Sequence, residues 1–301
     1  CLHNHLEIVQ LLLDRGANAD AIENESWTPL HCACLHNHLE VVQLLLDAGV
    51  DVEARQSYHR TALHLACLNF NDRLEIVELL LDRGADMEAA DRDEWRPLHH
   101  VCKDNYLELA AFLLDRGADM EAGDEDGNTP LHIACRYGQL EITRLLLIRG
   151  AKTDMPTHYG RTPLHFACQN SYAEVAELLL NQNNANIESQ DEDGCTALHL
   201  SCRYDRLRKT SGLLLDRGAD LEANDNNLRT PLHAACLKGY VAMAEFLLDR
   251  GADKEAKGNC EWTALHCASA NGHSTVAGLL LARGVDLEAQ DINSNTPLHI
   301  A

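Results

Sequence analysis

The sequence predicts an all-α repeat solenoid, in which pairs of short helices are joined by hairpin-like connections and stack side by side. Two observations carry this prediction. A tetrapeptide of the form T-[PA]-L-H returns with a nearly constant period along the 301 residues. Between its copies, leucines recur at the three- and four-residue spacing of an amphipathic helix. Self-similarity with a fixed period of roughly 20 to 50 residues is the sequence signature of a repeat architecture.

The tetrapeptide marks the start of each repeat unit. Its nine copies are spaced by 33, 35, 33, 33, 34, 34, 33 and 33 residues, and one copy is the variant RPLH. The starts are Thr28, Thr61, Arg96, Thr129, Thr162, Thr196, Thr230, Thr263 and Thr296. We therefore expect one array over residues 1–301, with a partial first unit at 1–27, complete units starting near 28, 61, 96, 129, 162, 196, 230 and 263, and a partial last unit at 296–301.

Each part of the unit predicts a local structure. Thr28 can cap the start of a helix through its hydroxyl group, and Pro29 suits the first helical position. This predicts a first helix over about residues 29–37. After a polar turn, Leu39, Val42 and Leu46 share one face of a second helix.

A glycine that can take a positive φ predicts the end of the second helix. Gly49 holds this position in the first complete unit, and Asn184 replaces the glycine in one later unit. The remaining members are Gly16, Gly84, Gly117, Gly150, Gly218, Gly251 and Gly284. An extended acidic connection then leads to the next tetrapeptide.

These residues resemble the ankyrin repeat, whose TPLH pattern and 33-residue period recur over the whole chain. The resemblance implies helix–turn–helix units joined by β-hairpin fingers and stacked into a curved solenoid. One unit is too small to bury its apolar face alone, so its neighbours must cover it. The resemblance also implies that the finger tips and the exposed side of the first helix form the contact surface for other proteins.

Histidine and cysteine crowd together in TPLHCACLHNHLE, residues 28–40, as they would in a zinc site. The repeat offers a structural explanation, because His31 and Cys34 each belong to a column that recurs once per unit. In ankyrin repeats this histidine resembles a hydrogen-bonding residue that ties adjacent units together, and a buried cysteine can replace the usual small alanine. Columns run parallel, whereas zinc needs four convergent ligands. We therefore expect no metal and no cofactor.

Two cysteines, Cys195 and Cys260, fall in the connections, where we expect them to be exposed and more reactive than the column cysteines. Metal or redox sensing through cysteines is the weakest of the functions that we consider. No glycine-rich phosphate loop, HExxH motif or nucleophile elbow is present in the sequence, so we expect no enzymatic activity and no small-molecule substrate.

The charge is strongly negative, with 47 acidic and 25 basic residues and a formal net charge of -22. Such a surface repels phosphate backbones, so nucleic acid is not the expected partner, whereas a basic protein segment is. No apolar run is long enough to span a membrane, so we expect no membrane insertion. Neighbouring column cysteines should lie too far apart for disulfides, which favours an intracellular, cytoplasmic location.

An acidic residue stands eight positions before each unit start, where ankyrin repeats commonly have Asn. The column comprises Asp20, Glu53, Glu88, Glu121, Asp154, Glu188, Glu222, Glu255 and Glu288. These carboxylates could accept hydrogen bonds from backbone N–H groups of the neighbouring connection, since buried N–H groups need acceptors. They could also attract a basic peptide, and the sequence leaves both interpretations open.

The variable position directly before the tetrapeptide supplies the candidate binding residues, because Trp, Tyr and Arg most often anchor interfaces. All three tryptophans of the chain fall in this column. Together with two tyrosines near the ends of first helices, the candidates are Trp27, Arg60, Trp95, Tyr137, Arg161, Tyr204, Arg229 and Trp262. The alternative is that the tryptophans only pack against the next finger.

The function that these observations favour is a protein–protein interaction scaffold without catalysis, which binds partner proteins or peptides through its finger tips and concave helix face. The main alternative is a regulatory or targeting segment of a larger enzyme, channel or signalling protein.

Overall fold

The computed structural model describes residues 1–68, 74–182, 185–204 and 208–301, and it contains the predicted succession of short helices. Asn184, the exception in the glycine column, lies outside the described residues. The chain divides into two compact units, one of residues 1–134 and 141–151, the other of residues 135–140 and 152–301. We call them unit 1 and unit 2. Whether the two units join into the single array expected over residues 1–301 depends on how they are arranged, so that expectation stays a prediction.

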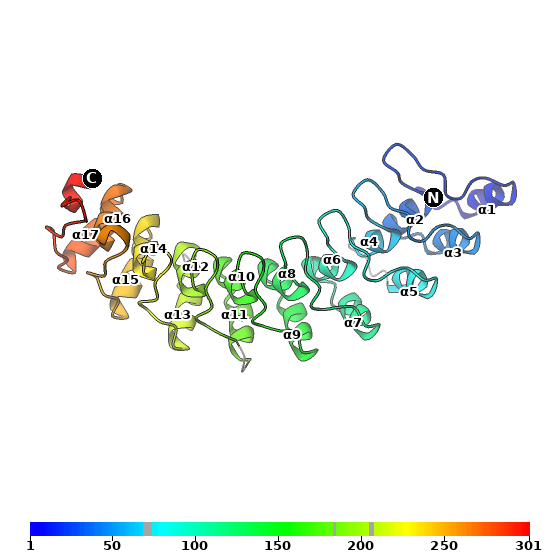
Figure 1. Cartoon of the computed structure of the whole chain (residues 1–301). Coiled ribbons are helices and arrows are strands. Elements are labelled where there is room, and N and C mark those ends of the chain that lie inside the picture. Colours follow the sequence, from blue (N-terminus) through cyan, green and yellow to red (C-terminus); the bar gives the residue numbers. More distant parts are fainter. Residues whose placement is uncertain (69–73, 183–184, 205–207) are drawn as a thin grey trace. The chain divides into compact units, whose positions relative to one another are not determined.

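Unit 1 is built from helix pairs in which the first helices form one layer and the second helices another (Figure 1). The first helices are α2 (Pro29–Leu35), α4 (Ala62–Ala66), α6 (Pro97–Asp104) and the start of α8 (Pro130–Tyr137). The second helices are α1 (Leu6–Asp14), α3 (Leu39–Asp47), α5 (Leu74–Asp82), α7 (Leu107–Asp115) and α9 (Leu140–Ile148), whose first residue belongs to unit 2.

Unit 2 repeats this two-layer arrangement. Its layer of first helices holds α10 (Pro163–Gln169), α12 (Ala197–Tyr204), α14 (Pro231–Lys238), α16 (Ala264–Ala270) and α18 (Pro297–Ile300). Its layer of second helices holds α11 (Ala173–Leu180), α13 (Lys209–Asp216), α15 (Val241–Asp249) and α17 (Ser274–Ala282), and a short 3-10 helix, η1 (Asn259–Glu261), lies in a connection.

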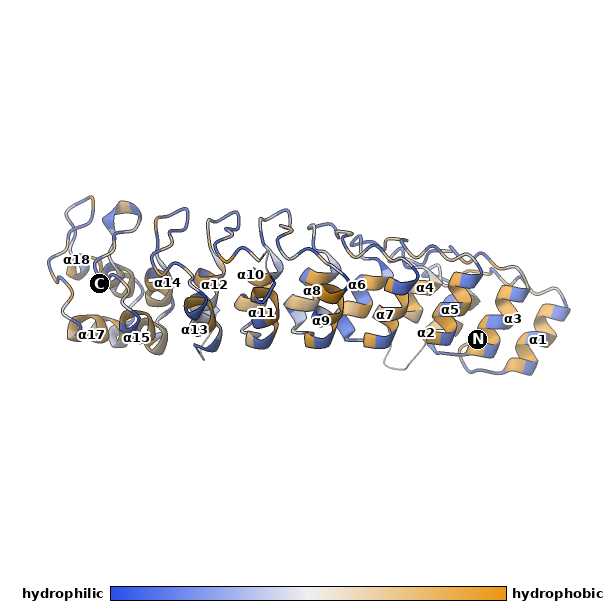
Figure 2. Cartoon of the chain, turned by 90° about the horizontal axis from the view of Figure 1, so that it is seen from below, coloured by the Kyte–Doolittle hydropathy of each residue, from blue (hydrophilic) through white to orange (hydrophobic). Residues whose placement is uncertain are grey.

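The core lies between the two helix layers and between neighbouring pairs. Val41, Val42 and Leu45 of α3 are at most 1% exposed, and Figure 2 shows the hydrophobic stripes of the helices below hydrophilic connections. Burying one such side chain contributes about 1.5–3 kcal/mol. The predicted cysteine column is part of this core, since Cys34 and its equivalents are fully buried. Among the described residues, none of the helices has both the length and the apolar character needed to cross a membrane.

The connections are hairpin-shaped loops, which we call fingers, and the structure assigns no strand within the described residues. Each finger closes on itself through a backbone bond such as Asp91 N–H to Trp95 O, 2.9 Å. A second bond, such as Arg92 N–H to Tyr58 O at 3.0 Å, joins it to the finger before. The expected β-hairpins are therefore hydrogen-bonded turns, because one or two bonds per neighbour are too few for a ladder.

Candidate interaction surface

The histidine column connects neighbouring repeats by hydrogen bonds. In the first complete repeat, Nδ1 of His31 lies 3.1 Å from the backbone nitrogen of Thr28 and 2.9 Å from its hydroxyl, and Nε2 lies 3.2 Å from the carbonyl oxygen of Arg60 in the next repeat. The same bond to the next repeat recurs at His64, His99, His165, His199, His233 and His266. The histidines thus cap their own helix and hold the following finger.

The hydrogen bonds fix the protonation state of these histidines. Because a backbone N–H donates to Nδ1, that nitrogen carries no proton, and Nε2–H donates to the carbonyl oxygen. Burial disfavours the charged imidazolium and lowers the pKa of His64 and of His99 to about 4. His64 and His99 are therefore neutral at physiological pH.

The crowded histidines and cysteines of residues 28–40 do not converge. His31 belongs to the hydrogen-bonded column, Cys34 is fully buried, and Nδ1 of His38 lies 2.7 Å from the carbonyl oxygen of Cys1. His36 is exposed and its ring stacks on His38 at 5.9 Å. Over the described parts of the chain, no group of three or more His, Cys, Asp or Glu is placed to hold a metal ion.

The acidic column accepts backbone hydrogen bonds from the next finger. Glu53 Oε1 accepts from Asp86 N–H at 2.8 Å, and Glu222 Oε1 accepts from Asp253 N–H at 2.8 Å. Asp20, Glu88, Glu188 and Glu255 make the equivalent bond. Burial raises the pKa of Glu222. This geometry favours the structural interpretation of the column, since one oxygen of each of these carboxylates is already engaged.

A second acidic row, which the sequence analysis did not single out, stabilises the fingers from inside. Asp91 is buried, and its Oδ1 accepts from the backbone N–H groups of Asp93 and Trp95 at 3.0 Å each. Its Oδ2 pairs with Arg60 Nε and His100 Nε2, both at 3.1 Å. Burial alone would raise the pKa of Asp91, but these hydrogen bonds outweigh it and hold the pKa below its usual range.

In unit 1 the candidate residues before the tetrapeptide are half-buried at the bases of the fingers. The Trp27 ring meets His31 edge-on at 6.1 Å, and the Trp95 ring lies 5.1 Å from that of His100. The Arg60 guanidinium pairs with the buried carboxylate of Asp91, so part of its hydrogen-bonding capacity is used to stabilise the fold. The tryptophans thus pack on their own scaffold and also present one side to solvent.

In unit 2 the structure brings two candidates together. Arg229 and Trp262 line one cavity of about 190 Å³, together with Asn227 and Asn259 at the finger tips. Arg229 also pairs with the buried carboxylate of Asp225 at 2.8 Å. Arg161 pairs with buried Asp191 of the next finger at 3.4 Å, as Arg60 does with Asp91.

The tyrosine candidates lie at the far ends of the first helices. Tyr137 is 41% exposed at the end of α8, and Tyr204 is 48% exposed at the end of α12. Eight helical residues separate them from the finger side, which is about 12 Å at 1.5 Å per residue. They therefore lie at the opposite end of the first helix from the column before the tetrapeptide, and their part in one contact surface with that column stays a prediction.

Two further tyrosines were missed in the sequence. Tyr58 and Tyr159 stand three positions before a tetrapeptide, at finger tips, and are 55% and 47% exposed. The Arg60 guanidinium lies 5.8 Å from the centre of the Tyr58 ring. A column search at this position would have found them, since aromatic residues are enriched at interfaces.

The expected exposure of the cysteines in the connections is confirmed for Cys260 and wrong for Cys195, and the reactivity of Cys260 stays a prediction. Cys260 is exposed, whereas Cys195 is fully buried beneath its finger. Burial raises the pKa of Cys195 to about 11, so its thiol is protonated at neutral pH. The error arose because the residue before the tetrapeptide turns inward where it is small.

Comparison with known families gives a consistent result along the chain. A model described as ankyrin repeats in three copies matches residues 1–91, 86–157, 146–225 and 181–258, and a model of many ankyrin copies matches residues 255–301. A search of curated proteins found no match. Since the family models together cover the whole sequence, the chain belongs to the ankyrin-repeat family.

Proposed function

We propose that this chain binds a partner protein through the finger side of its repeats, with Trp27 and Trp95 as anchors in unit 1 and Trp262 with Arg229 in unit 2. Ankyrin repeats generally act as protein–protein interaction modules, and ankyrin-repeat proteins are typically non-enzymatic scaffolds. The scaffold role without catalysis is therefore the function that we assign.

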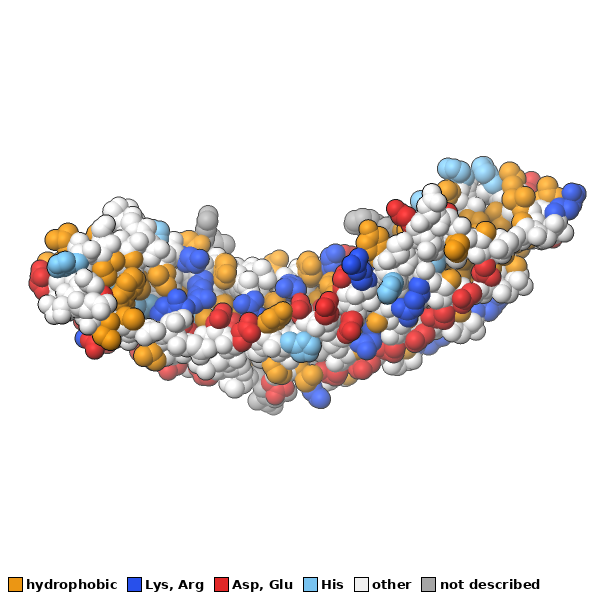
Figure 3. All heavy atoms as spheres, turned by 45° about the horizontal axis from the view of Figure 1, so that its top comes forward, with side chains coloured by type: hydrophobic (Ala, Val, Ile, Leu, Met, Phe, Trp, Pro, Cys, Tyr) orange, Lys and Arg blue, Asp and Glu red, His pale blue; other side chains and the backbone are white. Residues whose placement is uncertain are grey.

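The single observation that carries the proposal is the position of Arg229 and Trp262. Both side chains are half-buried yet line an open cavity at the finger bases. A half-buried tryptophan is already ordered by its packing, so a partner that covers it loses little further side-chain freedom. Acidic side chains line one edge of unit 1 in Figure 3, with Lys and Arg scattered among them. This charge favours a partner whose contact segment is basic.

Affinity capture with the purified chain tests the proposal. The variants are Trp27→Ala with Trp95→Ala for unit 1, and Trp262→Ala for unit 2, each checked by circular dichroism for an unchanged fold. The control is Ile148→Ala, which removes a 75% exposed apolar side chain from a second helix rather than from a finger. We expect at least one tryptophan variant to lose a partner that the control retains. Capture that is the same for all variants would refute the finger-side site.

A further inference from the structure

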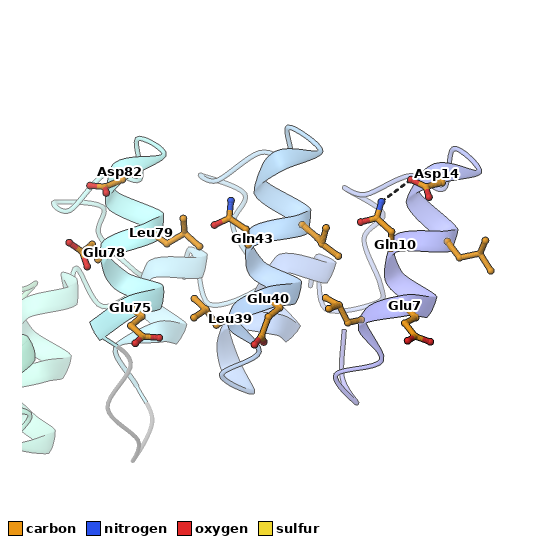
Figure 4. Close-up of a pocket in the computed structure, with 13 residues that line it drawn as sticks. Glu7, Gln10, Asp14, Leu39, Glu40, Gln43, Glu75, Glu78, Leu79 and Asp82 are labelled. Carbon is orange, nitrogen blue, oxygen red and sulfur yellow. Dashed lines mark hydrogen bonds between the residues drawn. The ribbon is translucent and has the colours of Figure 1, made fainter.

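The second-helix layer of unit 1 forms an open groove of about 1000 Å³ that the finger-side function does not use. It runs across α1, α3 and α5 (Figure 4), in a different layer from the first helices that follow the tryptophans. Its floor is apolar. Figure 4 shows Leu39 and Leu79 between α3 and α5, and Leu11 of α1 is 53% exposed.

The rims of the groove are acidic. Glu7, Glu40 and Glu75 lie in the first turns of the three helices and follow one another along one rim in Figure 4. Asp14 and Asp82 lie at the helix ends along the other rim. Six carboxylates line the groove and none of the lining residues is Lys or Arg: Glu7, Asp14, Glu40, Glu75, Glu78 and Asp82.

Most of this charge is not neutralised by the fold. The Arg116 guanidinium pairs with Asp82 at 3.0 Å and with Glu78 at 3.5 Å, so one end of the groove is compensated. The equivalent arginine is replaced by Ala48 in the first complete repeat. Asp14 accepts a hydrogen bond from the Gln10 amide at 2.8 Å and forms no ion pair with the residues that the structure describes.

The glutamate rim carries the remaining charge. Glu7, Glu40 and Glu75 are all exposed. They form no ion pair with any residue that the structure describes. Among the described residues, this row of carboxylates therefore faces solvent without a cationic partner.

We propose that this groove binds a helical segment of a partner protein that presents a leucine-like face flanked by Lys or Arg. An apolar floor between two acidic rims is complementary to such a helix in both polarity and charge. Three helices packed about 8–10 Å apart give a groove of roughly 16–20 Å, which a helix of about 13 residues spans. A second copy of this chain, nucleic acid or an anionic lipid surface would meet like charge, given the net charge of -22.

The test uses a fluorescein-labelled synthetic Leu/Lys peptide of about 18 residues, with leucines at helical spacing. Its binding to the full chain is followed by fluorescence anisotropy at about 50 mM and about 300 mM NaCl. A peptide of the same composition in scrambled order controls for charge alone. The groove variant combines Glu7→Gln, Glu40→Gln and Glu75→Gln.

The matched control combines Glu125→Gln, Glu174→Gln and Glu192→Gln, which removes three exposed carboxylates outside the groove. We expect the groove variant to bind the peptide at least about tenfold more weakly at low salt, and the control to change by less than about twofold. The scrambled peptide should bind more weakly than the ordered one.

Three results would overturn the proposal. The first is no binding of the ordered peptide, and the second is an equal loss in both variants, which would indicate attraction to the bulk charge. The third is equal binding of the two peptides. The variant with Trp27→Ala and Trp95→Ala should bind the peptide normally, so a failure of the groove and a failure of the finger-side site are distinguishable.

Discussion

The histidine column makes the stability of unit 1 depend on pH in a predictable direction. His64 and His99 are neutral in the folded chain, and each holds the next finger through Nε2, at 3.1 and 3.0 Å from a carbonyl oxygen. Protonation of Nδ1 would place a proton against the backbone N–H that donates to it, 3.2 Å away in both cases. The perturbation is therefore acidification from pH 7.5 to 5.0.

The sign and size of the effect follow from linkage. The pKa of each residue is about 4 in the folded chain, below the 6.5 of an ordinary histidine, so the unfolded chain takes up protons first as the pH falls. The free energy of unfolding that comes from keeping these two histidines neutral is fully present above about pH 6.5, and it is lost progressively as the pH falls towards 4. At pH 5.0 the loss is about 2 kcal/mol for each residue.

Urea unfolding followed by circular dichroism at the two pH values measures this loss. The two histidines together lose about 4 kcal/mol in the parent chain, which lowers the urea midpoint by about 2 M for a slope near 2 kcal/mol/M. Acidification also reduces the net charge, but it does so in every variant, so the comparison isolates the histidine. His99→Gln should reduce the pH dependence by about 2 kcal/mol, whereas the exposed His36→Gln should leave it unchanged.

The reasoning would be refuted by a midpoint that is equal at pH 7.5 and 5.0 in the parent chain. It would also be refuted if His99→Gln and His36→Gln shared the parent's full pH dependence. Either result would mean that the column histidines are not held neutral by burial.

Two further predictions concern the buried carboxylates and the thiols. Asp225→Asn should lower the free energy of unfolding of unit 2 by about 3 kcal/mol, because Arg203 and Arg229 both pair with the buried Asp225 carboxylate and would lose its charge. A urea midpoint unchanged from that of the parent would contradict this prediction. In thiol titration with a coloured disulfide reagent, Cys260→Ser should remove one fast-reacting thiol, because Cys260 is exposed. Cys195→Ala should remove none, because Cys195 is buried. Loss of a fast phase in Cys195→Ala would contradict this and show that the finger above Cys195 opens.

Part of the candidate surface could be read from the sequence because the repeat assigns each position a fixed environment. The tetrapeptide located the helix starts, and the column before it singled out Trp27, Trp95 and Trp262, which the structure places at the finger bases. The burial of Cys195, which stands in the same column, could not be predicted in this way. Cys195 shares the position of the tryptophans but is fully buried, since a small side chain turns inward where a large one cannot.

The sequence by itself determined the repeat unit, its helix starts and ends, and the buried columns, because each follows from short-range spacing of Thr, Leu and Gly. Only the tertiary structure decided which polar groups pair between neighbouring repeats. Asp91 contacts Arg60 and His100, residues 31 and 9 positions away, and no local pattern indicates this contact. The acidic groove of α1, α3 and α5 also arises only when equivalent helices stand side by side, since side chains about 33 residues apart then form one surface.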